Sequence, residues 1–225
     1  MNPTLDAYVN KDHRILHVYR EAKRRYAEAG RPHHNFAHVM RDLHRALLIA
    51  REEEGVNYNV LIPGVLLHDI GFCTHEHGKE GHDAVGAALA AKMLPPVGYG
   101  QEEIDAVCHC IRAHKGHSEV PRTLEAKILY DADVLEKAGL VFLIFGGKVI
   151  GEFQESLDEF LRREIAHRSR EISRGLYTRK GRQLDGGRLQ RVVSLFRQIQ
   201  GEITEDRPDY RISESDLWAN QIPTE

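Results

Sequence analysis

The sequence of 225 residues has few cysteines, no long apolar run and no large excess of either charge, and each shortage excludes a class of protein. Three cysteines (Cys73, Cys108 and Cys110) cannot build a disulfide framework and suit a reducing compartment, so we expect a cytoplasmic protein. The longest apolar run, residues 140–145, is far too short for a membrane span. The N-terminal residues lack the basic and apolar segments of a signal peptide, so no membrane partner is expected.

The charge balance and several missing motifs narrow the function further. Lys and Arg number 31 against 34 Asp and Glu, a net charge of -3, so no global field attracts nucleic acid and a nucleic-acid partner is not favoured. The segment Gly146-Gly147-Lys148-Val149 lacks the spacing and the hydroxyl residue of a P-loop. The chain has no Gly-x-Gly-x-x-Gly, no His-Glu-x-x-His and no Gly-x-Ser-x-Gly, which argues against dinucleotide binding, zincin chemistry and serine hydrolysis.

Apolar residues recur at helical spacing almost throughout, and no stretch alternates with a period of two. We therefore expect an all-α fold, a helical bundle of about eight helices in a single domain. The expected helices cover residues 5–29, 36–54, 59–70, 80–94, 101–113, 123–135, 150–165 and 189–203. Asn35 and Asn59 are expected as N-caps, Gly30 and Gly71 as the ends of helices, and residues 178–182 as a loop. Residues 1–30 are expected to pack on the main domain, 31–205, and residues 206–225 to form a polar tail.

Histidine is the unusual residue, with 14 copies that mostly precede residue 120. His68 and Asp69 end an apolar run, where two polar side chains need a partner. On its own the pair fits a helix end closed by Gly71 as well as a metal site. His38 and an aspartate of the segment Asp131-Ala132-Asp133 can complete a set of two imidazoles and two carboxylates, which favours Mn²⁺ or Fe²⁺ and also accepts Mg²⁺, Co²⁺ or Zn²⁺.

The order of these residues is specific. The segments are His34-Asn35-Phe36-Ala37-His38-Val39, Leu67-His68-Asp69-Ile70-Gly71 and Asp131-Ala132-Asp133-Val134-Leu135. From about residue 33 to 205 the chain resembles the HD-domain metal-dependent phosphohydrolase superfamily. It looks most like a compact bacterial branch, some of whose members cleave nucleoside triphosphates to monophosphate and pyrophosphate. The resemblance implies an HD-type helical bundle whose metal ligands are His38, His68, Asp69 and Asp133, with Asp131 as the competing fourth ligand.

The resemblance also implies a second tier of residues. In relatives with two metals, histidines at about the places of His82 and His114 hold the second ion, and in one-metal relatives they contact phosphate or move protons. Some nucleotidase relatives carry a catalytic Glu three residues after the His-Asp pair, where this chain has Phe72. We therefore expect the proton-transfer group elsewhere, at Glu76, His82 or His114. Asp131 and His109 are expected beside the metal ligands.

Residues 162–191 carry ten Lys or Arg and three acidic residues. A solvated helix face would explain this charge, and so would a set of phosphate ligands that folds over the pocket. The expected substrate-binding residues are Arg163, Arg170, Arg179, Lys180 and Arg182.

The leading hypothesis is a metal-dependent hydrolase of phosphoester or phosphoanhydride bonds in a small phosphorylated molecule. A nucleotide is the favoured substrate, with nucleoside triphosphate pyrophosphohydrolase-like activity. The alternatives are a cyclic-nucleotide or dinucleotide phosphodiesterase with two metals, a di-iron HD-type oxygenase, and a non-catalytic nucleotide sensor stabilised by metal. A second copy of the chain is a further candidate partner, as a homodimer.

Overall fold

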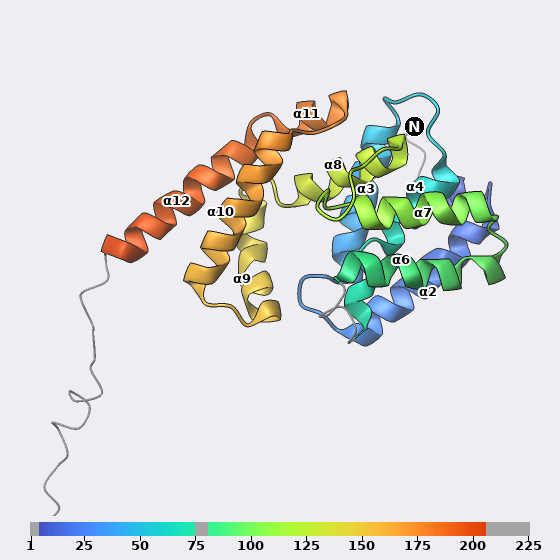
Figure 1. The fold of residues 1–225 in the computed structure, drawn as a ribbon, viewed down its shortest axis with the longest axis horizontal. Helices are drawn as coiled ribbons and strands as arrows, with labels where there is room; N and C mark the ends of the chain where they lie inside the picture. The colour runs from blue at the N-terminus through green and yellow to red at the C-terminus, as the bar shows by residue number, and fades with distance from the viewer. Residues whose placement is uncertain (1–4, 75–80, 206–225) are drawn as a thin grey trace, which may run out of the picture.

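The computed structural model describes residues 5–74 and 81–205, and all of its regular elements in these ranges are helices, as predicted (Figure 1). They are α1 (Leu5–Val9), α2 (His13–Ala29), α3 (Phe36–Ala50), α4 (Tyr58–Leu67), η1 (Ile70–Cys73), α6 (His82–Met93), η2 (Pro95–Val97), α7 (Gln101–Ala113), α8 (Leu124–Glu136), α9 (Val141–Phe153), α10 (Leu157–Arg174), α11 (Arg179–Asp185) and α12 (Arg188–Glu205). The described helices outnumber the eight expected because two expected helices are each broken in two, and because α11 and the short helices η1 and η2 were not predicted. The expected tail, 206–225, lies outside the described residues.

The first break separates α1 from α2, where one helix was predicted. The Asp12 side chain accepts a hydrogen bond from the Arg14 backbone N–H at 2.9 Å, so Asp12 caps a new helix. That helix ends at Gly30, which has the left-handed conformation (φ 61°) that suits glycine. The buried face of α2 carries Ile15, Val18 and Tyr26 and joins the main hydrophobic core.

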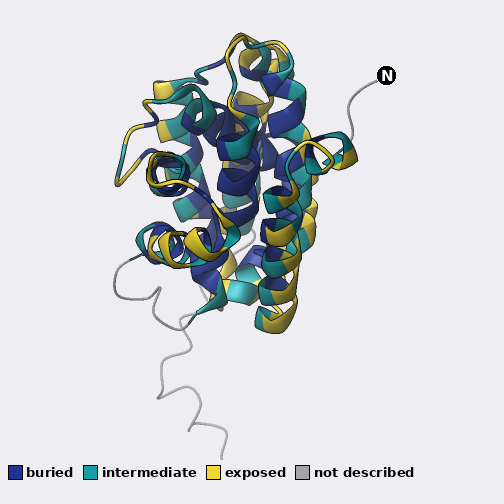
Figure 2. Ribbon diagram, turned by 90° about the vertical axis from the view of Figure 1, so that its right-hand side faces the viewer, coloured by how far each residue is buried: buried dark blue, intermediate teal, exposed yellow. Residues whose placement is uncertain are grey.

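Helix α4 is the centre of the bundle, and its residues from Val60 to Leu67 are all buried (Figure 2). Helices α2, α3, α6, α7 and α8 surround it. The prediction for its ends was wrong: Asn57 is the N-cap in place of Asn59, and the helix stops at Leu67 instead of Ile70. His68 and Asp69 therefore occupy a turn between α4 and η1, from which both side chains reach the interior.

Gly71 of η1 lies against the first turn of α6. A Cβ atom at this position would lie 2.0 Å from the carbonyl oxygen of His82 and 2.9 Å from its Cα. Only a glycine lets the two backbones approach so closely. Gly71 thus sets the position of His82 relative to the His68-Asp69 turn.

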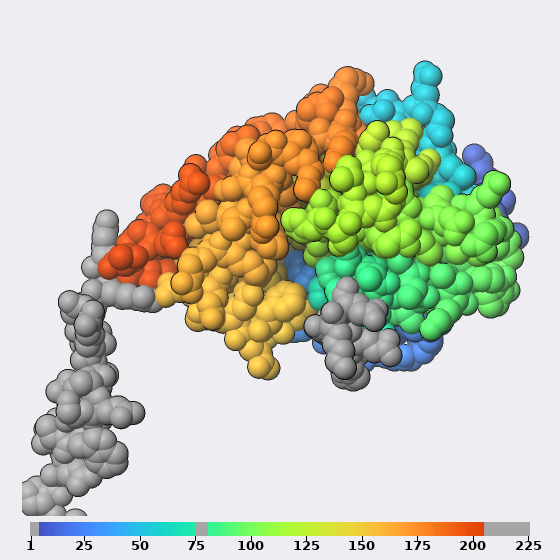
Figure 3. Space-filling model, viewed as in Figure 1, coloured from blue at the N-terminus to red at the C-terminus, as the bar shows by residue number. Residues whose placement is uncertain are grey.

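Helices α9, α10 and α12 form a unit with a small core of their own, which extends away from the bundle in Figure 1. The predicted helix over 150–165 is broken here, since Gln154 adopts a left-handed conformation (φ 54°) and Ser156 caps α10. Residues 178–182, expected as a loop, include the start of α11. The space-filling view shows a hollow between this yellow-to-orange unit and the green body (Figure 3). In the described ranges no helix has the length and apolarity that crossing a bilayer requires.

Candidate metal centre

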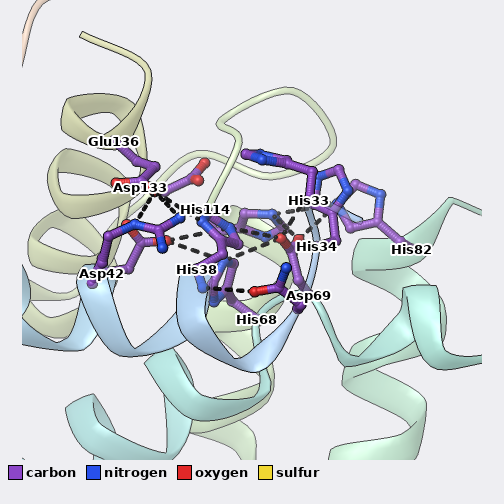
Figure 4. Close-up of polar contacts among 12 residues, drawn as sticks. His33, His34, His38, Asp42, His68, Asp69, His82, His114, Asp133 and Glu136 are labelled. Carbon is purple, nitrogen blue, oxygen red and sulfur yellow. Dashed lines mark hydrogen bonds and ion pairs between the residues drawn. The ribbon is translucent and has the colours of Figure 1, made fainter. Parts of the chain in front are cut away.

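Four buried side chains from three parts of the bundle meet at the end of α4 (Figure 4). His38 and Asp42 come from adjacent turns of α3, His68 from the turn after α4, and Asp133 from α8. One potential ligand atom from each lies within 4.8 Å of all the others. The His38 Nε2 atom is 3.3 Å from Asp42 Oδ2, and the His68 Nε2 atom is 3.7 Å from the same oxygen. The structure thus brings together His38, His68 and Asp133 as predicted, and adds Asp42.

The Asp69 carboxylate joins this group to a second one. Its Oδ2 atom lies 3.2 Å from His38 Nε2 and 3.3 Å from His68 Nε2. Its Oδ1 atom faces the other way, 3.5 Å from His82 Nε2 and 3.4 Å from His114 Nε2. Asp69, His82 and His114 form a second cluster of possible ligands. One carboxylate therefore has an oxygen in each of two adjacent ligand sets.

Backbone carbonyls fix the tautomers of two of these histidines. The Nδ1 atom of His68 lies 2.8 Å from the carbonyl oxygen of Val65, and that of His114 lies 2.6 Å from the carbonyl oxygen of Ile111. A carbonyl can only accept, so each Nδ1 carries the proton. In the neutral ring Nε2 then presents its lone pair to the cluster, which is the usual way a metal-binding histidine is held.

The unsatisfied atoms of the cluster fit a divalent cation. His68 Nε2, Asp42 Oδ2 and Asp69 Oδ1 are buried and have no hydrogen-bond partner. Burying such polar atoms without a partner costs free energy, which a bound ion would recover. Neighbouring ligands about 2.1 Å from an octahedral ion lie about 3.0 Å apart, close to the 3.2–3.5 Å separations around Asp69. The donor set of imidazoles and carboxylates suits Mn²⁺ or Fe²⁺.

The electrostatics of the cluster without a cation also favour the binding of a divalent cation. Burial raises the pKa of Asp42 to about 6, with a further contribution from Asp133. Burial alone would lower the pKa of His38, but Asp42, Asp69 and Glu136 raise it to about 10. Bound protons thus reduce the electrostatic repulsion among the buried carboxylates in the metal-free protein. A bound cation would neutralise the carboxylates instead, and the protons would be released.

Two residues expected beside the ligands lie elsewhere. Asp131 points away from Asp133 and accepts hydrogen bonds from the Tyr177 and Thr178 backbone N–H groups at 2.9 and 2.8 Å, which fastens the start of α11 to α8. His109 contacts Glu119 Oε1 at 2.7 Å and accepts from the Arg122 backbone N–H. Glu76, expected as a catalytic residue, lies outside the described residues.

A narrow cavity of about 80 Å³ lies beside the cluster, between the bundle and the α9–α10 pair. Its lining comprises His33, His34, Lys115, His117, Asp133 and Lys137 from the body, Phe142, Val149 and Phe153 from α9, and Arg163, Glu164, His167, Arg168 and Glu171 from α10. We call it the interhelix pocket. Asp133 connects it directly to the metal ligands.

Three cations of the interhelix pocket were missed by the sequence reasoning. Lys137 Nζ lies 2.6 Å from Asp133 Oδ1, and Arg168 Nη1 lies 3.0 Å from Glu171 Oε2. Lys115 directly follows His114, and its ammonium has no hydrogen-bond or ion-pair partner within the described part of the chain. Burial lowers its pKa, and nearby Lys137 lowers it further. Lys115 is therefore the pocket cation best suited to receive an anion.

Of the five basic residues predicted to bind substrate, one lines the interhelix pocket. This residue is Arg163, which is paired with Glu155 and Glu164. Arg170 is exposed on α10. Arg179 and Lys180 pair with Glu52 of the body, at 2.7 and 3.3 Å. Arg182 donates to the carbonyls of residues 176 and 177. The predicted loop of phosphate ligands is thus a helix fastened to the body.

The helical bundle and its buried His and Asp cluster define an all-α protein with a ligand set that could hold a divalent metal. Residues 35–138 match the family model described as HD domain. Over 153 residues the chain is 31% identical to ribonuclease Y of Acidothermus cellulolyticus, covering 65% of this chain and 27% of that protein. Over 163 residues it is 26% identical to the 3'-5' exoribonuclease YhaM of Listeria monocytogenes, covering 63% of this chain and 52% of that one. The chain thus spans about a quarter to a half of these relatives.

Solved structures agree with the family model. A protein described as a predicted HD superfamily hydrolase, from an uncultured Thermotogales bacterium, is 25% identical and superposes with a TM-score of 0.56, over 89% of this chain and 99% of that one. Bacillus subtilis YpgQ, solved in complex with ADP, shares the fold at 18% identity, with a TM-score of 0.58 over 84% of this chain and 97% of its own. Residues 35–138 therefore form an HD domain, in agreement with the predicted resemblance to the HD-domain phosphohydrolase superfamily.

Proposed function

We propose that this protein hydrolyses a phosphoester or phosphoanhydride bond in a small phosphorylated substrate, with a nucleotide as the favoured class. The observation that carries the proposal is the connection between the buried ligand cluster and the interhelix pocket. Asp133 belongs to both, its Oδ1 atom lies 2.6 Å from Lys137 Nζ, and Lys115 and Arg168 also line the pocket. Cations placed beside a metal site are what a phosphate chain requires.

The ion-binding residues are proposed to be His38, Asp42, His68 and Asp133, with Asp69 between this set and the second one. A divalent cation there would polarise a phosphoryl oxygen and lower the pKa of a bound water. Lys115 would bind a phosphate oxygen, because its ammonium lacks a partner among the described residues. Phe142 and Phe153 give the pocket an apolar wall that helps exclude water.

The proposal is tested by measuring phosphate and pyrophosphate release from a panel of nucleoside mono-, di- and triphosphates, with Mn²⁺, Fe²⁺, Mg²⁺, Co²⁺ and Zn²⁺ in turn. Asp69→Ala is the inactive reference, since Asp69 faces histidines of both ligand sets, namely His38, His68, His82 and His114. Glu28→Gln, an exposed α2 side chain paired with Arg24, is the matched control. If the wild-type protein cleaves no phosphate bond with any metal, the proposal fails. A nucleotide that raises the thermal stability yet stays intact would then favour the sensor hypothesis.

A second candidate, phosphodiester hydrolysis, is favoured by Asp69, whose two oxygens face separate ligand sets. Two ions bridged by one carboxylate, about 3.5–4 Å apart, are a common device of phosphodiesterases. The relatives named as ribonucleases make an oligonucleotide a competitor of the small phosphorylated substrate that the resemblance implies, although the charge balance did not favour a nucleic-acid partner. Elemental analysis distinguishes the candidates, because one metal per chain would contradict the two-metal reaction. The same preparation, assayed with and without dioxygen, tests the di-iron oxygenase hypothesis.

A further inference from the structure

The histidines that face the two ligand sets are not all oriented in the same way (Figure 4). The Nδ1 atoms of His68 and His114 lie 2.8 and 2.6 Å from backbone carbonyl oxygens. The Nδ1 atom of His82, at the start of α6, has no hydrogen-bond partner among residues 5–74 and 81–205. The torsion about the Cβ–Cγ bond of a histidine has broad energy minima, so another contact must fix the plane of the His82 ring.

The ring of Phe72 provides that contact. Its centroid lies 4.1 Å from the centroid of the His82 ring, and the two planes differ by 11°, so the rings stack face to face. Such a stack restricts rotation of the imidazole, because a turned ring would push its edge into the phenyl face. In this orientation the His82 Nε2 atom lies 3.5 Å from Asp69 Oδ1 and 3.3 Å from His114 Nε2.

Phe72 is itself fixed in place. Its backbone N–H donates to the carbonyl oxygen of Asp69 at 3.0 Å, and its own carbonyl oxygen accepts from Arg31 Nε at 2.7 Å. The other face of its ring stacks on His34, with a centroid distance of 4.1 Å. Phe72 is only 6% exposed, so little room is left for its ring to move. It therefore links the position of the Asp69 turn to the orientation of the His82 ring.

We propose that Phe72 is the positioning residue of His82, and that its ring holds the His82 Nε2 atom where the second ligand set can bind a cation. This inference rests on the two-metal form of the proposed function. His68 and His114 are oriented by hydrogen bonds, whereas His82 is oriented by an aromatic stack. Phe72 carries no ligand atom, so its effect on the reaction passes through the position of His82.

The first test measures Mn²⁺ binding by calorimetry and elemental analysis. Phe72→Leu keeps an apolar side chain but removes the flat ring, whereas Phe72→Tyr keeps the ring. Two ions should bind to the wild type, and Phe72→Leu should weaken the second about 10–100-fold while changing the first less than about threefold. Phe72→Tyr should bind both ions as the wild type does. Phe196→Leu is the matched control, because it removes a buried ring from the separate core of α9, α10 and α12.

Several outcomes of this test would overturn the inference. One Mn²⁺ per wild-type chain would remove the second site. An unchanged affinity for the second ion in Phe72→Leu would show that the stack is not needed. Equal weakening of both ions would indicate general damage to the bundle, and an equal loss in Phe72→Tyr and Phe72→Leu would show that the ring is not the cause.

Hydrolysis gives a readout that a merely structural role would not move. In Phe72→Leu the Mn²⁺ concentration at half-maximal rate should rise about 10–100-fold, while kcat at saturating Mn²⁺ stays within about threefold of the wild type, because the bound ion orients His82. A kcat that stays low at saturating Mn²⁺ would contradict the positioning role. If the wild type binds two ions and Phe72→Leu loses the second, yet neither hydrolyses any substrate, the proposed function fails and the assignment of Phe72 stands.

NMR tests the stack without metal. In the wild type kept in chelator, the ring protons of Phe72 and His82 should show nuclear Overhauser effects to each other, and those of His82 should be shifted upfield by the phenyl ring. The absence of both signals in a folded wild-type protein would refute the geometry.

Discussion

Replacing Gly71 by alanine tests whether the close approach of η1 and α6 holds the second ligand set in place. The new Cβ atom would lie 2.0 Å from the carbonyl oxygen of His82, whereas ordinary contacts begin at about 3.4 Å. The start of α6 must therefore move by about 1.4 Å, the difference between these distances. The clashing atoms belong to the backbone, so no side-chain rotation can relieve the contact.

Two losses are expected from this shift. Overpacking of a tight contact costs about 1–3 kcal/mol of the free energy of unfolding. The His82 ring would also move relative to Asp69 and His114, from which its Nε2 atom is now 3.5 and 3.3 Å away. A misplacement of about 1 Å can lower a catalytic rate by about 10²-fold. We therefore expect Gly71→Ala to be folded, less stable and nearly inactive.

Gly201→Ala is the matched control, because the same substitution there meets no atom within 4 Å and lies inside α12. Alanine in a helix interior should raise the free energy of unfolding by about 0.5–1 kcal/mol, with no effect on kcat. Urea unfolding and nucleotide hydrolysis are measured for both variants. The reasoning is refuted if Gly71→Ala keeps wild-type kcat and unfolds within about 0.5 kcal/mol of the wild type.

Three further predictions concern the cluster and its supports. Asp42→Asn should weaken Mn²⁺ binding by at least about tenfold in calorimetry, and unchanged affinity would remove Asp42 from the ligand set. Thr178→Val removes a 2.6 Å hydrogen bond to buried Asp131 and should cost about 1.5–3 kcal/mol in urea unfolding; a loss of kcat would place Asp131 in the site after all. Stability should also fall with acid. Burial alone would raise the pKa of Glu152 in the folded protein, but hydrogen bonds from His34 and from the backbone lower it to about 2, below the ordinary value of 4.5. Its contribution of up to about 3 kcal/mol to the free energy of unfolding is therefore complete above pH 4.5 and lost toward pH 2. His33, whose pKa burial lowers to about 2, acts in the same direction below pH 6.5, and a urea midpoint independent of pH from 6.5 to 3 would contradict both assignments.

The fold was predictable where local signals decide it. The bounds of α7, residues 101–113, and the Asn35 cap of α3 follow from apolar spacing and cap chemistry, and both predictions are confirmed. Two breaks were missed although their caps were readable, namely Asp12 before α2 and the Ser156-x-x-Glu159 capping box before α10. In both places an apolar stripe continues across the break and hides it.

The candidate site was predictable in part. The resemblance led to His38, His68, Asp69 and Asp133, which the structure places together. Asp42 could have been found from its spacing, because a carboxylate four residues after His38 lies on the same helix face. Lys137 could have been found in the same way, because it follows Asp133 by four residues. Glu152 gave no local signal, since it follows His34 by 118 residues and contacts it only through the packing of α9 on the body. Such partners are consequences of tertiary structure.

The separate core of the α9–α10–α12 unit has a consequence for how proteins with this fold can diversify. The cluster residues His38, Asp42, His68, Asp69, His82, His114 and Asp133 all belong to the bundle, whereas one wall of the interhelix pocket belongs to the other unit. Substitutions in that unit can reshape the wall while the packing around the ions stays as it is. We expect a graft of these three helices between homologues to change the wall of the pocket and to leave the ligand set in place, provided that the graft keeps Glu152, which hydrogen-bonds His34.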